Sequence, residues 1–156
     1  MKKVLDFIRF FFISPEFVLG ITIFTTLILF PEIAKFVSSY IFNTEMKWND
    51  YLKLLGIPTT SVIFTYKFGD IILNPEDKKN RVTLKKWSKY WMLKNRIWFA
   101  IIISVLSLLG SLWSWYYAVN TDITYGTIFL MTFWSVSLIS FSTVALAKLS
   151  IKDILY

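Results

Sequence analysis

The segment "NPEDKKNRVTLKKWSKYWMLKNR" (residues 74–96) decides how this chain folds, because it is rich in lysine and arginine and separates two apolar stretches. In membrane proteins, basic loops of this kind stay on the cytoplasmic side of the bilayer. The segment therefore predicts the orientation of its neighbours as well as its own position. Its basic residues are Lys78, Lys79, Arg81, Lys85, Lys86, Lys89, Lys94 and Arg96.

The composition of the whole chain is typical of a membrane protein. Of its 156 residues, 56% are hydrophobic and 19% are aromatic, which is more than an ordinary soluble domain carries. The chain has no cysteine and no histidine, so it lacks disulfides, the usual general base and the commonest metal ligand. It shows no Walker motif, no nucleophile with a base and no metal-ligand cluster. We expect no enzymatic activity, no metal and no cofactor.

Four stretches are long and apolar enough to cross a hydrocarbon core, which takes about 20 residues. The sequence predicts transmembrane helices over residues 17–36, 52–73, 97–119 and 123–147. With the basic loop inside, alternation places both termini in the cytoplasm, and the two outside connections are poor in lysine and arginine. The predicted fold is all-α: one integral membrane domain, a four-helix bundle with its N- and C-termini inside.

Residues 1–13 ("MKKVLDFIRFFFI") predict a short amphipathic helix that lies in the membrane interface. Charged residues interrupt its apolar core and no small-residue cleavage site follows, unlike a signal peptide. The residues Ser14, Pro15 and Glu16 then start the first span, because they suit the N-cap, the first helical position and the positive helix end.

Two roles stay open for this amphipathic helix. It can be an anchor that sets the tilt of the first span. In an oligomer, it can instead cover the cytoplasmic mouth of a pore, with Phe7 and Phe11 as the plug.

The span over 52–73 is the most polar and holds the candidate pore-lining residues. Their spacings of three and four place them on one side of a helix, which we call the polar stripe. The polar stripe consists of Gly56, Thr59, Thr60, Ile63, Lys67 and Asp70. It is either a polar face buried inside a monomeric bundle, where Lys67 and Asp70 can pair, or the lining of a water-filled path. Glu32 is a further pore-lining candidate, because in a ring it would form a carboxylate collar that favours cations, partly cancelled by Lys35.

The last two spans carry small residues on one face each. Such residues let membrane helices approach closely, so the pattern predicts a tight hairpin and not a substrate site. The residues are Ser104, Ser107, Ser111 and Ser114 in one span and Ser137, Ser140, Thr143 and Ala147 in the other.

The basic loop predicts a helix that starts near residues 74–77 and places Leu84, Trp87 and Trp91 on one face. A basic amphipathic helix normally lies against anionic lipid. The alternative is a site for an anionic ligand such as a nucleotide. The candidate residues for either contact are Lys78, Lys79, Arg81, Lys85, Lys86 and Lys89.

These features favour a homo-oligomeric channel or pore-forming effector, since ring symmetry builds a central path from a short chain. The alternatives are a non-catalytic accessory subunit or anchor of a larger membrane complex, and an immunity or exclusion protein.

The segment "MKKVLDFIRFFFI", the four spans and the lysine-rich inner loop together resemble the small membrane effectors of bacterial antiphage defence, including the Hailong type. The resemblance implies a tetramer-like channel in the bacterial inner membrane that depolarises the cell. It also implies that the N-terminal helix keeps the channel shut and that a partner nucleotidyltransferase supplies a nucleotide signal. We expect the lipid bilayer, and no nucleic acid polymer, as a further partner. Phage holins have a similar layout.

Overall fold

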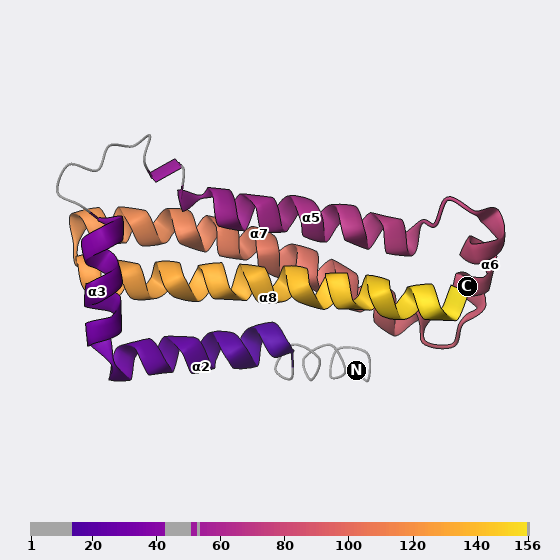
Figure 1. Ribbon diagram of the computed structural model, residues 1–156, viewed down its shortest axis with the longest axis horizontal. Helices are drawn as coiled ribbons and strands as arrows, with labels where there is room; N and C mark the ends of the chain where they lie inside the picture. Colours follow the sequence, from indigo (N-terminus) through magenta and orange to yellow (C-terminus); the bar gives the residue numbers. More distant parts are fainter. Residues whose placement is uncertain (1–13, 43–50, 53, 156) are drawn as a thin grey trace, which may run out of the picture.

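The computed structural model describes residues 14–42, 51–52 and 54–155, and within these residues it contains helices and no strands. The helices are α2 (Pro15–Leu29), α3 (Pro31–Ile41), α5 (Gly56–Leu73), α6 (Lys78–Lys86), α7 (Tyr90–Asn120) and α8 (Ile123–Leu155). Helices α2, α5, α7 and α8 run side by side, α3 crosses one end, and α6 lies at the other end (Figure 1). The predicted all-α class is confirmed.

The hairpin of α7 and α8 forms the centre of the fold. Asp122 lies in the turn, where its carboxylate accepts a hydrogen bond of 2.9 Å from the backbone N–H of Tyr125. The helices approach so closely near this turn that a Cβ on Gly126 would lie 2.5 Å from the Cα of Ala118. The predicted tight hairpin is confirmed, since its serine faces are buried. The buried serines are Ser104, Ser107, Ser111, Ser114, Ser137 and Ser140.

Helices α5 and α2 lie on opposite sides of this hairpin (Figure 1). Helix α5 packs against both α7 and α8, whereas α2 packs mainly against α8. Buried Tyr51 fixes the chain just before α5, because its hydroxyl donates to the carbonyl of Ser111 and its ring stacks on Trp115 at 4.8 Å between centroids. Gly20 of α2 lies against Val136 of α8, where an added Cβ would come within 2.8 Å of the valine side chain.

Helices α7 and α8 are each long and apolar enough to cross a membrane. Helices α2 and α3 pass the same test only as a pair, and they are bent by 93°. The described residues therefore contain two helices able to cross a membrane, or three such elements if the bent pair counts as one. Helix α5 is not among them, because threonines, Pro58, Lys67 and Asp70 lower its apolar character.

The expectation of one continuous helix over 17–36 is wrong, although the two helices that replace it pass the membrane test as a pair. The helix stops at Leu29, Phe30 leaves the helical conformation (φ −122°, ψ 68°), and a new helix begins at Pro31. Proline has no N–H to donate, and its ring clashes with the carbonyl four residues earlier, so it is tolerated in the first turn of a helix and not in its interior. The sharp bend follows from this break.

The predicted helix in the basic loop is right at its start and wrong in its extent. Asp77 caps α6 by accepting a hydrogen bond of 2.9 Å from the backbone N–H of Lys79. The helix ends at Lys86, and α7 already begins at Tyr90. Leu84 is therefore buried whereas Trp91 of α7 is exposed, so these side chains do not share one apolar face.

Candidate functional site

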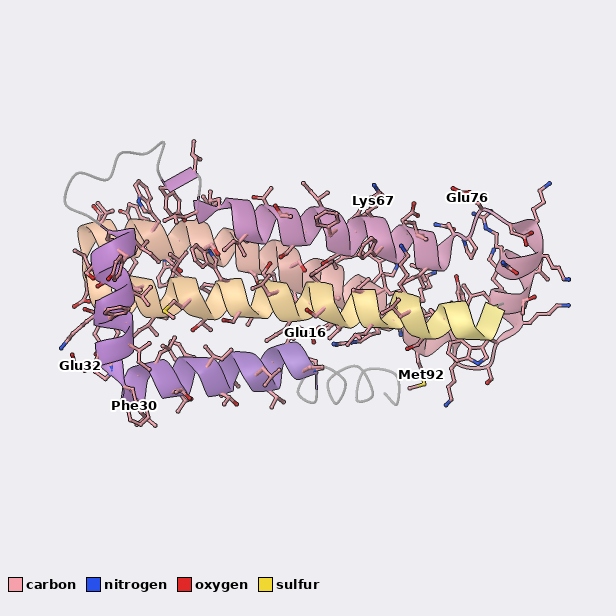
Figure 2. All side chains as sticks on the ribbon, viewed as in Figure 1. Glu16, Phe30, Glu32, Lys67, Glu76 and Met92 are labelled. Atoms are coloured by element: carbon pink, nitrogen blue, oxygen red, sulfur yellow. The ribbon has the colours of Figure 1, made fainter. Side chains whose placement is uncertain are left out.

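The polar stripe lies on the outside of α5, on the side opposite the face that packs against α7 and α8. All its members are exposed: Gly56, Thr59, Thr60, Ile63, Lys67 and Asp70. The buried residues of α5 are Pro58, Ser61, Thr65, Gly69 and Ile72. At about 100° per residue, the two sets lie on opposite sides of the helix. The side chain of Lys67 points away from α7 and α8 (Figure 2), so the interpretation as a polar face buried inside a monomeric bundle is wrong.

Lys67 and Asp70 do not form an ion pair with each other in the part of the chain that the structure describes. Instead, the Asp70 carboxylate accepts a hydrogen bond of 2.7 Å from the amide of Asn74. The carbonyl oxygen of the same amide accepts a hydrogen bond of 3.3 Å from Arg81 of α6. Asp70 is thus linked to a cation through Asn74, whereas no described carboxylate lies within ion-pair distance of Lys67.

Glu32 is separated from the polar stripe. It lies on α3 next to the bend, and α7 and α8 stand between it and Lys67 (Figure 2). Its carboxylate pairs with Lys35 one turn later, at 3.0 Å between Oε1 and Nζ. Within one chain, Glu32 and the polar stripe therefore do not face the same path.

The basic residues proposed for an anionic ligand or lipid gather at the α6 end of the molecule, next to the end of α5 (Figure 1). All of them are exposed: Lys78, Lys79, Arg81, Lys85, Lys86 and Lys89. The plug candidates Phe7 and Phe11 lie outside the described residues.

Sequence reasoning missed an internal polar cluster of Glu16, Arg96 and Thr143. Ser14 caps α2 as predicted, accepting a hydrogen bond of 3.2 Å from the backbone N–H of Phe17. Glu16 is only 1% exposed, and both its carboxylate oxygens lie 2.6 Å from one guanidinium nitrogen of Arg96. The Thr143 hydroxyl donates to the same carboxylate at 3.0 Å. This cluster ties α2 to α7 and α8.

An apolar cavity of about 330 Å³ adjoins this cluster. Side chains of α2, α7 and α8 line it, among them Phe24, Ile103 and Phe133, and no α5 residue takes part. The cavity and the polar stripe are therefore separate features on different sides of the molecule.

Comparison of the chain with protein-family models, with curated proteins and with solved structures finds no match.

Proposed function

We propose that this protein is a homo-oligomeric membrane channel in which α5 of each copy faces a shared water-filled path. The observation that carries the proposal is the direction of the polar stripe. Its threonines, Lys67 and Asp70 lie opposite the face that packs against α7 and α8. The described part of the chain therefore leaves this polar surface uncovered.

The energetics of the bilayer argue against lipid as the neighbour of this surface. A lysine or aspartate at the centre of a membrane helix costs about 2.5–3.5 kcal/mol on insertion scales. Lys67 lies about 9 Å from the end of α5, taking about 1.5 Å per residue, so its long side chain can reach towards the interface. Thr59 and Thr60 lie near the opposite end of α5, and their short side chains reach less far than that of Lys67. Water in a path between copies satisfies the whole polar stripe at once.

Unlike α7 and α8, α5 is not apolar enough to qualify as a membrane span, and a place inside an assembly explains this composition. Copies arranged by closed ring symmetry shield α5 from lipid, while α7 and α8 remain able to face the bilayer. In this proposal the chain contributes four spans with both termini inside, the bend between α2 and α3 included. The N-terminal amphipathic segment closes the path, and an anionic signal at the basic α6 end opens it.

Conductance of the purified chain tests the proposal directly. Full-length protein and a form lacking Met1–Ile13 are reconstituted in planar bilayers at matched amounts. We expect ionic current, larger in the truncated form. The double substitution Lys67→Leu and Asp70→Leu should leave insertion intact and change the unit conductance.

The matched control uses Glu32 and Lys35, the ion pair on α3. The double substitution Glu32→Leu and Lys35→Leu removes the same charge types away from the polar stripe and should leave conductance unchanged. Absence of current from both forms would contradict the channel and favour the accessory-subunit alternative, in which another membrane protein covers α5. Unchanged conductance in the Lys67 and Asp70 variant would remove α5 from the path.

A further inference from the structure

We infer that the path along α5 passes anions in preference to cations, with Lys67 as the residue that determines this selectivity. The inference rests on the proposed channel and names the class of ion that it carries. It follows from which charges on and near the polar stripe have partners and which do not.

Lys67 supplies the uncompensated charge of the polar stripe. Its side chain is exposed on the face opposite the α7–α8 hairpin, and no described carboxylate lies within ion-pair distance. In a ring of copies, one such ammonium from each chain forms a collar of positive charge. Rings of lysine or arginine are the arrangement that selects anions in pores.

Asp70 is the acidic residue of the polar stripe and does not balance this charge. Its carboxylate is held by the amide of Asn74 at 2.7 Å, and that amide accepts a hydrogen bond from the Arg81 guanidinium at 3.3 Å. The guanidinium therefore offsets the field of Asp70 at the α6 end of α5, and the net charge of this Asp70–Asn74–Arg81 chain is zero.

The surroundings of that end add positive charge. Glu76 and Asp77 are the acids of the segment between α5 and the end of α6, and Asp77 is engaged in capping α6. With Arg81 offset by Asp70, the exposed lysines still outnumber these acids: Lys78, Lys79, Lys85 and Lys86. A positively charged mouth raises the local concentration of anions. Glu32, the residue expected from the sequence to favour cations, lies across the molecule and is paired with Lys35.

The reversal potential in a potassium chloride gradient tests the inference. Full-length protein is recorded in planar bilayers of neutral lipid, and the truncated form lacking Met1–Ile13 is recorded in parallel. We expect the reversal potential to have the same sign as the equilibrium potential of chloride, and not that of potassium. Lys67→Gln should lower the chloride-to-potassium permeability ratio severalfold, and Lys67→Glu should bring it below one. Lys35→Gln is the matched control, because it removes a lysine on α3, and it should leave the ratio unchanged.

Each outcome separates this inference from the proposed function. Current that reverses on the potassium side would overturn the anion path and leave the channel standing. A chloride preference that Lys67→Gln and Lys35→Gln leave equally unchanged would overturn the role of Lys67. Absence of current from every form would overturn the channel itself, and the anion path with it.

Discussion

The internal polar cluster around Glu16 and the exposed Lys67 of the polar stripe differ in how their charges are compensated. Glu16 is buried and fully engaged by Arg96 and Thr143, which lie on two other helices. Lys67 is exposed and has no carboxylate partner in the described part of the chain. A buried charge must be paired within its own fold, whereas an uncovered charge on a membrane helix needs a partner from outside. The internal cluster therefore ties α2 to α7 and α8, whereas Lys67 is left for the contacts that the proposed assembly supplies.

The largest expected effect on stability comes from breaking the internal cluster. Arg96→Ala leaves the Glu16 carboxylate buried without its cation, and removing one partner of a buried pair costs about 3–5 kcal/mol. The free energy of unfolding, measured by denaturant titration in detergent micelles, should fall by this amount. Lys67→Ala is the control on the other side of the comparison and should leave the unfolding free energy nearly unchanged.

A compensating variant sharpens this result. The double substitution Glu16→Leu and Arg96→Met removes both charges, and replacing an ion pair by apolar residues is often neutral or stabilising. We expect it to recover most of the loss. Failure of the double variant to recover would show that packing at these positions, and not the uncompensated carboxylate, dominates the energetics.

The next effect concerns close packing of the central hairpin. Gly126→Ala places a methyl group 2.5 Å from the Cα of Ala118, where backbone must move, and overpacking of this kind costs about 1–3 kcal/mol. The same unfolding titration measures it. Gly56→Ala is the matched control, because nothing lies within 4 Å of its added Cβ. Equal losses in the two variants would contradict the close approach of α7 and α8.

The smallest effect compares two threonines on opposite sides of α5. Thr65 is fully buried, and its hydroxyl lies 3.4 Å from that of Ser104 on α7. Thr65→Val should lower the unfolding free energy by about 0.6 kcal/mol, the average for polar contacts between membrane helices. Thr60→Val, on the polar stripe, should leave stability unchanged and alter conductance instead. A reversed order would mean that α5 packs by its other face.

Local patterns made part of this fold predictable. The N-cap at Ser14 with Pro15 behind it follows from the chemistry of helix ends. The serine faces of α7 and α8 follow from the spacing of small residues. The same chemistry also predicts the bend, although the mostly apolar character of 17–36 favoured one continuous helix. Proline followed by glutamate occurs at Pro15 and again at Pro31, and both prolines begin helices.

Other features depend on tertiary structure and could not be predicted from local pattern. Glu16 and Arg96 are 80 residues apart in sequence, and the local sequence around either residue does not predict their contact. The periodicity of α5 defines its polar stripe but not whether that side faces the α7–α8 hairpin or points outward. The end of α6 at Lys86 has no glycine or proline to mark it.

The bend at Phe30 has a consequence for the bilayer itself. Helix α2 has 15 residues and is about 22 Å long, taking about 1.5 Å per residue, whereas the hydrocarbon core is about 30 Å thick. Helix α3 continues at 93° to it, so α2 by itself is shorter than the hydrocarbon core, whereas the 31-residue α7 is longer. Such hydrophobic mismatch thins the adjacent lipid. In the proposed membrane setting, the protein should therefore thin the bilayer on the α2 side, and its stability should depend on the acyl-chain length of the lipids around it.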